Sequence, residues 1–492
     1  MGMKKVALIS IYSEDTKGIP PLGPLYLATA LKKNGIDVRI IHKSESHSHE
    51  IESEIALYHP DLVGMSVFTG YLNRRYVELS KNLKNQRYLI AWGNAQPSLL
   101  PEEVLQTEYV DFSVIGEGEA TLVELVKNLG DTQKYSTILG LGFKNQAGEI
   151  VINDRRPFIN IDDYLIDWSL IDLENYIVPY FSGRYKRTLA VTTSRGCPFN
   201  CQFCYNLIFN NRRWRGHAAE KMISNLKPII EKYKIDAIRF LDDNFFVDKE
   251  RSFMIARGLG LPYFGDCRVE MVDEEFVKNL KETKCLEIMF GLESGSDRIL
   301  KEVVQKGTTT KDIIKAVTLL KNTGIMASGS FVLGFPGETK AEYAMTMKFI
   351  CKLLEINNNL AFTVGWFLPY PGTGLYEKAK ELGFSPPERI EDWDIFDRWR
   401  NDYRMEWIKW DYRLPVKYSR KLTQLLGMAY KRNIPLAKRI FKFRAEHLFF
   451  RLPIDIYIFH KLRGIYMFKG DNNFITRFIK KIIIKMMRVA KK

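Results

Sequence analysis

Apolar and polar segments alternate along the first 130 residues in a pattern that predicts strands and helices in turn. Continuous apolar runs, typical of strands buried on both faces, are separated by amphipathic stretches such as Leu25–Gly35. Strands are expected at residues 6–11, 38–41, 61–68, 87–93 and 110–116. The alternation predicts a doubly wound parallel sheet of the Rossmann type, whose ligands bind at the carboxyl ends of the strands.

Residues 188–380 repeat the alternation of strands and helices about six times. Strands are expected at residues 188–193, 235–244, 262–270, 286–296, 329–339 and 361–376. Six such units predict a partial (β/α)6 barrel of the TIM type, which does its chemistry at the carboxyl ends of its strands. We therefore expect an α/β protein in four parts: a Rossmann-like domain (1–130), a linker (131–187), the barrel (188–380) and a mainly helical C-terminal region (381–492).

Composition and charge exclude several classes of protein. Apolar residues make up 46% and charged residues 27% of the 492 residues, which is typical of a globular chain. The net charge is +15, but residues 411–492 alone carry 21 Lys and Arg against 4 Asp and Glu. The rest is close to neutral, which argues against nucleic-acid binding. No apolar run reaches the ~18 residues of a membrane span, and no signal peptide is recognised, so we expect a cytoplasmic protein.

The final helix, expected over residues 471–492, is both basic and amphipathic. Phe474, Phe478 and Ile482 fall on one face, and lysines and arginines fill much of the rest. Such a helix suits the surface of an anionic membrane, so we expect possible peripheral contact at the inner face of the cell membrane. The alternative is a helix that packs on the protein with its lysines in solvent.

Three cysteines follow the first strand of the predicted barrel within eight residues. Cys197, Cys201 and Cys204 have the spacing Cys-x3-Cys-x2-Cys, with Phe203 before the last of them. Three thiolates can hold three irons of a [4Fe–4S] cluster and leave the fourth iron open for another ligand. The rival is a structural zinc site, which needs a fourth ligand, and His217 follows thirteen residues later.

Polar or glycine-rich segments end three later strands of the barrel. They are Asp242-Asp243, Glu293-Ser294 and Gly334-Phe335-Pro336-Gly337. Because parallel strands end at one edge, we expect these segments to lie near the cysteines. Each also has an ordinary structural interpretation: a helix cap for the aspartates, a tight turn for the glycines and a plain strand-end carboxylate for Glu293.

The order of these motifs resembles the radical S-adenosylmethionine (radical SAM) superfamily. The resemblance covers residues 185–380 and rests on the segments SRGCPFNCQFCYN, IDAIRFLDDN, LEIMFGLESGS and GSFVLGFPGET. It implies a [4Fe–4S] cluster on Cys197, Cys201 and Cys204. It also implies that S-adenosylmethionine is bound by residues at the strand ends. Asp242 or Asp243 would contact its amino group, Glu293 and Ser294 its ribose or methionine portion, and Gly334 and Pro336 its adenine.

The first 130 residues resemble the cobalamin-binding domain that precedes many radical SAM barrels. PPLGPLYLATALKKNG, PDLVGMSVFTG and VDFSVIGEGEATL carry this resemblance, which implies bound cobalamin. Its contacts would come from Ser66, Gly93, Asn94, Gly116 and Glu117. Two features depart from the pattern: Asp15–Gly18 lacks the histidine that ligates cobalt in other cobalamin proteins, and residues 93–96 lack a second glycine and a histidine. The alternative is a flavodoxin-like domain that serves only as a scaffold.

The combined resemblance implies an enzyme that cleaves S-adenosylmethionine to a 5′-deoxyadenosyl radical and, with cobalamin, methylates an unactivated carbon. Its partners would be an electron donor such as flavodoxin or ferredoxin and a small-molecule or lipid-like substrate. One alternative is oxidative cyclisation or rearrangement, as in anaerobic magnesium-protoporphyrin IX monomethyl ester cyclase. A radical SAM enzyme with an empty N-terminal domain, such as a methylthiotransferase, is disfavoured because no cysteine precedes Cys197. A non-catalytic metal-binding membrane adaptor is a more distant alternative.

Overall fold

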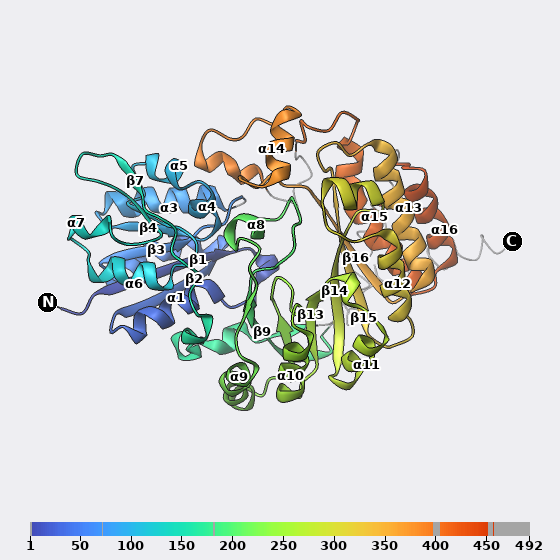
Figure 1. Cartoon of the computed structure of the whole chain (residues 1–492), viewed down its shortest axis with the longest axis horizontal. Helices are drawn as coiled ribbons and strands as arrows, with labels where there is room; N and C mark the ends of the chain where they lie inside the picture. Colours follow the sequence, from blue (N-terminus) through green and yellow to red (C-terminus); the bar gives the residue numbers. More distant parts are fainter. Residues whose placement is uncertain (1, 71, 181–182, 397–403, 451–455, 457–492) are drawn as a thin grey trace, which may run out of the picture.

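The computed structural model of the chain describes residues 2–70, 72–180, 183–396, 404–450 and 456. It contains two seven-stranded sheets, which lie side by side with helices packed around them (Figure 1). The helix expected over residues 471–492 lies outside the described residues. Within the described part, no helix is both long enough and apolar enough to cross a membrane.

The N-terminal sheet has the strand order β2-β1-β3-β4-β5-β6-β7. Its first five strands are parallel, which confirms the expected fold class, and β6 and β7 join its edge antiparallel. The hairpin of β6 and β7 lies in the range expected as a linker, yet it extends this sheet. The strands are β1 (Lys5–Tyr12), β2 (Asp37–Ser44), β3 (Leu62–Ser66), β4 (Ile90–Gly93), β5 (Phe112–Val114), β6 (Leu141–Lys144) and β7 (Ile150–Ile152).

Helices cover both faces of this sheet, as a doubly wound fold requires. On one face α1 and α6 bury Leu31 and Leu125, and on the other α2 and α3 bury Ile55 and Leu83. The helices are α1 (Leu22–Lys33), α2 (Ile51–Tyr58), α3 (Asn73–Asn85), α4 (Ala95–Leu99), α5 (Pro101–Gln106), α6 (Glu119–Lys127) and α7 (Thr132–Tyr135).

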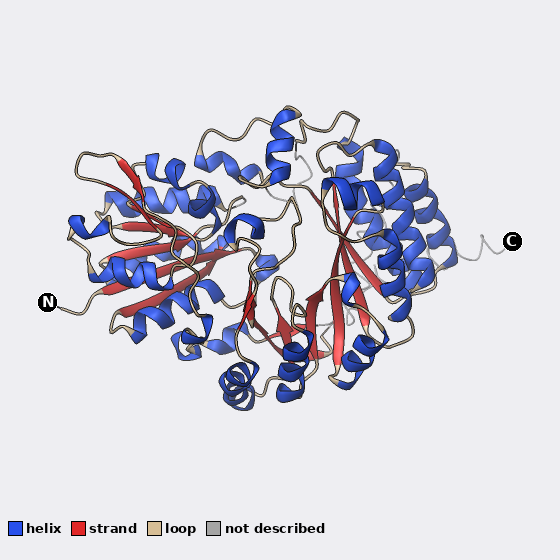
Figure 2. Ribbon diagram, viewed as in Figure 1, coloured by secondary structure: helices blue, strands red, loops and turns tan. Residues whose placement is uncertain are grey.

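The second sheet is the curled wall of a half-barrel (Figure 2). Its order is β16-β15-β14-β13-β12-β9-β8, with six parallel strands and β8 antiparallel at one edge. This confirms the expected six-stranded partial barrel. The strands are β8 (Val178–Tyr180), β9 (Tyr185–Val191), β12 (Ala237–Phe240), β13 (Tyr263–Cys267), β14 (Cys285–Glu293), β15 (Met326–Leu333) and β16 (Leu360–Trp366), with a separate ribbon of β10 (Ser194–Arg195) and β11 (Arg215–Gly216).

Four helices outside the half-barrel, α10 to α13, begin at side-chain caps that the sequence supplies. Thr309 and Thr339 each form a capping box with the acidic residue three positions later, and Asp248 caps α10. Such caps fix where each helix begins after its strand. The helices are α8 (Asn206–Phe209), α9 (Ala219–Tyr233), α10 (Lys249–Leu259), α11 (Glu274–Glu282), α12 (Thr310–Leu319) and α13 (Lys340–Ile356).

The described part of the C-terminal region is mainly helical, as expected. It contains α15 (Arg413–Lys431) and α16 (Pro435–Glu446), and α15 packs against β16 and α13. The helix α14 (Gly374–Glu381) comes just before this region, almost entirely within the range expected for the barrel. Tyr343 and Ser419 share a buried hydrogen bond of 2.6 Å at the contact of α15 with α13. Trp393 and Trp407 are buried, so these aromatic side chains fill the interior.

The segment between the two sheets fastens them together. Trp168 is buried and donates its indole N–H to Asn225 of α9, 3.2 Å away. Asp167 next to it forms an ion pair with Lys32 of α1 at 2.7 Å. The barrel core includes Tyr26 of α1. The two sheets are therefore held in one packed body, with a site between them.

Candidate active site

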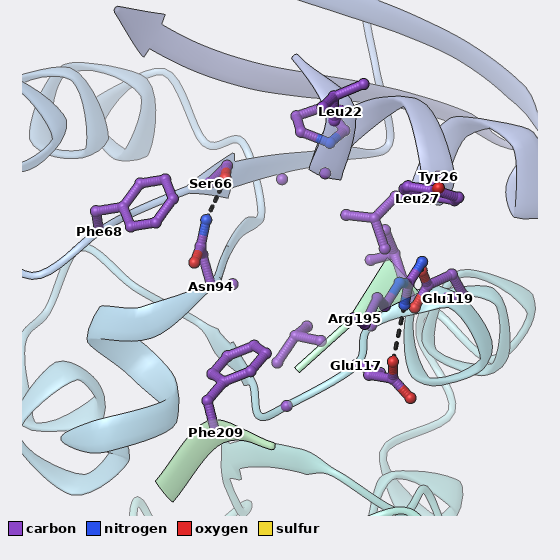
Figure 3. A pocket seen from close by; sticks show the side chains of 18 of the residues that line it. Leu22, Tyr26, Leu27, Ser66, Phe68, Asn94, Glu117, Glu119, Arg195 and Phe209 are labelled. Carbon is purple, nitrogen blue, oxygen red and sulfur yellow. Dashed lines mark hydrogen bonds and ion pairs between the residues drawn. The ribbon is translucent and has the colours of Figure 1, made fainter. Parts of the chain in front are cut away.

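A cavity of about 320 Å³ lies where the carboxyl ends of the N-terminal strands face the start of the half-barrel (Figure 3). It includes all five residues expected to contact a ligand of the N-terminal domain: Ser66, Gly93, Asn94, Gly116 and Glu117. From the barrel side the lining includes Ser194, Arg195, Gly196, Tyr205 and Asp243. The sequence-predicted residues of the N-terminal domain therefore do meet in one cavity.

Glycines line part of this cavity, which we call the glycine floor, where no side chain projects from the backbone. Gly116 has a φ of +76°, which favours glycine, and no heavy atom lies within 4 Å of a Cβ built on it. Gly93 has room for a Cβ near Val114, and Gly64 would meet Leu8. A side chain at Gly116 would therefore occupy open space beside the cavity. Such a floor fits the close approach of a large flat ligand, as cobalamin requires.

Asn94 shapes the loop after β4 rather than standing free in the cavity. Its φ is +81°, and its side-chain oxygen accepts a hydrogen bond of 2.7 Å from the N–H of Ala95. Its amide nitrogen donates to Ser66 over 3.0 Å (Figure 3). Asn94 and Ser66, two of the expected ligand contacts, are thus hydrogen-bonded to each other and form one polar part of the cavity lining.

Glu117 is held by two arginines of the barrel side. Its Oε1 accepts from Arg195 and from Arg215, each at 2.9 Å, and its Oε2 accepts from Arg215 at 2.8 Å and from the N–H of Ile159 at 3.1 Å. Its side chain is 6% exposed. Glu117 therefore joins the two domains at the cavity wall.

The three cysteines lie on the loop between β10 and α8. All three are free thiols and half-buried, and the N–H of Cys204 donates to the carbonyl of Cys201 over 2.9 Å. Burial raises the pKa of Cys197, and raises the pKa of Cys204 to about 12. Among the described residues, no group of three or more His, Cys, Asp or Glu side chains is gathered to hold a metal ion.

Two buried cations lie beside the cysteine loop. Arg268 places Nη1 3.7 Å from the sulfur of Cys201, and its guanidinium lies 3.8 Å above the ring of Phe199. Lys306 is buried and pairs with Glu293 at 3.0 Å. Arg268 also forms an ion pair with Glu270 at 2.6 Å, so both cations already have a carboxylate partner. The feature that fits an iron–sulfur cluster is therefore the presence of three free thiols on one loop.

His217, thirteen residues after the last cysteine and so beyond the short spacing that a zinc site would need, is bonded elsewhere. Its Nε2 lies 3.3 Å from the hydroxyl of Tyr26, and its Nδ1 lies 3.2 Å from Asp162. Burial lowers its pKa to about 4, so the ring is neutral at neutral pH. The histidine links α1 to the barrel and does not complete a zinc site.

Asp242 and Asp243 support the cysteine loop from the end of β12. Asp243 accepts from the N–H of Gly196 at 3.1 Å and from the hydroxyl of Tyr205 at 3.3 Å. These two residues flank the three cysteines in sequence. Asp242 is buried and accepts from the backbone and hydroxyl of Thr193 and from the hydroxyl of Ser194. Contact of either aspartate with S-adenosylmethionine stays a prediction.

The other four residues expected to contact S-adenosylmethionine lie at the ends of β14 and β15, outside the cavity lining. Glu293 has a φ of +56° and pairs with Lys306, and Ser294 is buried against Thr346 at 3.2 Å. The N–H of Gly334 donates to Glu338, and its carbonyl accepts from Trp407 at 2.7 Å. Pro336 is buried. Their role as contacts stays a prediction.

Four buried polar residues in this region were not identified from the sequence. Arg268 Nε, Glu338 Oε1 and both polar atoms of the Asn244 side chain have no hydrogen-bond partner among the described residues. Burial also raises the pKa of Glu338 to about 8. Unpartnered buried polar atoms are those that a bound polar ligand can satisfy. Asn244 and Glu338 come directly after Asp242-Asp243 and Gly334-Phe335-Pro336-Gly337, the segments already noted. No motif in the sequence around Arg268 or Lys306 marks them as site residues.

Comparison with known families divides the chain in the same way. Residues 14–126 match the B12 binding domain family, and residues 191–350 match the Radical SAM superfamily. The chain is 36% identical over 375 residues to an uncharacterized methyltransferase of Pyrococcus horikoshii, covering 73% of this chain and 78% of that one. It is 23% identical to the anaerobic magnesium-protoporphyrin IX monomethyl ester cyclase of Rubrivivax gelatinosus, covering 78% and 73%.

A solved structure shares the arrangement of both domains. The radical S-adenosylmethionine methyltransferase TsrM from Kitasatospora setae, solved with cobalamin and a [4Fe–4S] cluster, superposes with a TM-score of 0.65 at 16% identity. The match covers 91% of this chain and all of that one. The likeness shows that the overall fold is the same.

Proposed function

We propose, on the premise that this chain belongs to the B12-binding branch of the radical SAM superfamily, that it is a methyltransferase that methylates an unactivated carbon of a small organic substrate. Enzymes of this branch use a [4Fe–4S] cluster, S-adenosylmethionine and cobalamin. The observation that carries the proposal is the cavity that both domains line, from the glycine floor to the cysteine loop.

The cluster would be held by Cys197, Cys201 and Cys204. Arg268 would lie beside the sulfur of Cys201, and Asp243 would hold the two ends of the loop. Once bound, the cofactors supply the electron transfer, radical formation and methyl-group chemistry of the reaction. The protein residues bind and orient the reactants and keep water away from them.

Cobalamin would lie in the cavity against Ser66, Gly93, Asn94 and Gly116. Apolar side chains, among them Leu22, line the same cavity and would shield the ligand from water. Glu117 would act indirectly, because both of its oxygens are already bonded to the barrel side.

S-adenosylmethionine would bind between the cysteine loop and the strand ends of the barrel. Asp242, Asp243, Glu293, Ser294, Gly334 and Pro336 remain the candidate residues. We add Asn244, Arg268 and Glu338, whose unpartnered polar atoms are available to a bound ligand. Arg268 would contact its carboxylate through Nε, because Nη2 is already bonded to Glu270, to Thr308 and to the carbonyl of Lys306.

The reaction needs an external reductant, and we infer that it is a small electron carrier such as flavodoxin or ferredoxin. Peripheral contact with an anionic membrane is a separate proposal, supported by the basic composition of residues 411–492. Liposomes with and without anionic lipid test it, using the full chain and a form that lacks residues 471–492. Equal binding of the two forms would contradict the contact through that segment.

The proposed function is tested by incubating the anaerobically reconstituted protein with S-adenosylmethionine, hydroxocobalamin and a low-potential reductant. We expect 5′-deoxyadenosine to form and S-adenosylhomocysteine to accompany it when methyl transfer turns over. The variant Cys201→Ala should form neither product. The variant Cys351→Ala, which removes a buried cysteine on α13, is the matched control and should retain both. Absence of 5′-deoxyadenosine from the loaded wild type would contradict the proposal.

A further inference from the structure

Arg195 belongs to the cavity and to the cysteine loop at once. Its guanidinium lines the cavity, where Nη1 lies 2.9 Å from Glu117 and Nη2 lies 2.6 Å from Glu119 (Figure 3). The same group lies 4.4 Å from the ring centre of Tyr26. Along the backbone, Arg195 stands two residues before Cys197.

The contacts of Arg195 with the N-terminal domain are buried and directional. The side chains of Glu117 and Glu119 are 6% and 4% exposed, and that of Arg195 is 19% exposed. Removing one member of a buried ion pair leaves an uncompensated charge, which makes such a contact hard to break. The planar guanidinium also fixes the angle between its two partners. Arg195 is therefore tied rigidly to the loop that carries Gly116.

The backbone after Arg195 is packed just as closely. Arg195 pairs with Arg215 in the two-stranded ribbon, and the N–H of Gly196 donates to Asp243. Gly196 has a φ of +84°, and a Cβ there would lie 2.1 Å from the carbonyl oxygen of Arg213. Because this turn is tightly packed, a movement of Arg195 changes the conformation of Gly196. Such a movement therefore also displaces Cys197, the next residue.

We propose that Arg195 is a positioning residue that couples filling of the cavity to the conformation of the cysteine loop. The inference rests on the proposed function, because it takes cobalamin to fill the cavity and the cluster to load the loop. A ligand seated on Gly116 fixes the loop of Glu117 and Glu119, and through Arg195 it fixes the first cysteine. Coupling between two binding events is reciprocal, so the loaded cluster tightens cobalamin binding.

Equilibrium dialysis against hydroxocobalamin, with cobalt as the readout, measures this coupling without any turnover. The dissociation constant is compared between protein carrying the reconstituted cluster and protein from which iron has been removed. For the wild type we expect the two constants to differ by about 5-fold or more. In Arg195→Gln we expect the ratio of the two dissociation constants to be near one. In Arg195→Lys we expect an intermediate ratio, because lysine keeps the positive charge but lacks the planar guanidinium that contacts both glutamates.

Arg156→Gln is the matched control. Arg156 also forms a half-buried ion pair with α6, through Glu124 at 2.6 Å, but it does not line the cavity. This variant should keep the wild-type ratio. If Arg195→Gln fails to fold, Glu119→Gln removes one of the two contacts and should lower the ratio.

Two results would overturn the inference while leaving the proposed function intact. One is a wild-type protein that binds cobalamin equally well with and without the cluster. The other is a folded Arg195→Gln protein that keeps the wild-type ratio. A wild-type protein that binds no cobalamin in either state would instead overturn the proposed function, and this inference with it.

Discussion

The backbone N–H of Gly196 donates to the carboxylate of Asp243 over 3.1 Å, so the residue before the first cysteine is fastened to the end of β12. The same carboxylate accepts from Tyr205, the residue after the last cysteine, over 3.3 Å. One side chain thus holds both ends of the loop. Between the two ends, the N–H of Gln202 donates to the carbonyl of Val304 over 2.9 Å, so the middle of the loop is held to the barrel as well.

Loss of the clamp, the pair of hydrogen bonds that Asp243 accepts from Gly196 and Tyr205, is expected to weaken iron retention. Each hydrogen bond contributes about 1 kcal/mol, so loss of both bonds in Asp243→Ala should weaken iron binding by about 30-fold. Asp243→Asn keeps an acceptor oxygen, so its iron affinity should lie between those of the wild type and Asp243→Ala. Iron per chain after desalting under argon measures the effect. Wild-type iron retention in Asp243→Ala would show that the clamp does not hold the loop.

Gly196→Ala is expected to destabilise the loop through a steric clash as well as through its backbone angle. Its φ of +84° is unfavourable for alanine, and the new methyl would lie 2.1 Å from a backbone oxygen. Gly148→Ala is the matched control, because Gly148 has a φ of +82° and open space around it. Chemical denaturation should show a loss of about 1 kcal/mol for the control and a larger loss for Gly196→Ala. Equal losses would mean that the turn opens to admit the methyl group.

Lys306→Met is expected to be strongly destabilising because it leaves Glu293 buried without its cation. Both side chains are 6% exposed, and breaking such a pair costs about 3–5 kcal/mol. Adding Glu293→Gln should recover part of the loss.

The control is Lys380→Met, which breaks an exposed pair with Glu377 at the same 3.0 Å. The free energy of unfolding of that control should change by less than about 1 kcal/mol. Similar losses for the two lysine variants would contradict the buried-pair argument.

Glu338 predicts a specific pH dependence of stability. Burial raises its pKa in the folded state to about 8, above its unfolded value, so the folded protein retains a proton that the unfolded chain has lost. Its contribution to stability is therefore full at low pH and falls as the pH rises from about 4.5 to about 8. Glu338→Gln should remove this decline. Its stability relative to wild type should rise by about 1 kcal/mol or more between pH 5 and pH 8.

Thermal unfolding at the two pH values measures the effect of Glu338→Gln. The control is Glu377→Gln, at an exposed position of α14. A pH-independent difference between Glu338→Gln and wild type would show that Glu338 is ionised in the folded protein near neutral pH.

The sequence predicted the gathering of residues that end parallel strands, because such ends share one edge of a sheet. Ser66 ends β3, Gly93 ends β4 and Gly116 follows β5, and the structure brings them into one cavity. The apolar runs were sufficient to identify those strands. Their order then placed the cavity without any knowledge of side-chain contacts.

Contacts made across the sequence could not be predicted in this way. Glu117 was expected to face a ligand, but Arg195 and Arg215, 78 and 98 residues away, take its carboxylate. Arg268 reaches Cys201 from the end of β13, a distance of 67 residues along the chain. The hairpin of β6 and β7 looked like a linker because its pairing with β5 leaves no periodic signal. Each of these depends on packing between elements rather than on local pattern.

The iron and cobalt content of protein purified without oxygen from cells supplied with cobalamin tests the central claim most directly. About four irons and one cobalt per chain are expected after cluster reconstitution, and Cys197→Ala should lose the iron. Iron without cobalt would contradict the cobalamin half of the account and leave the N-terminal domain as a scaffold. Zinc in place of iron would contradict the account as a whole.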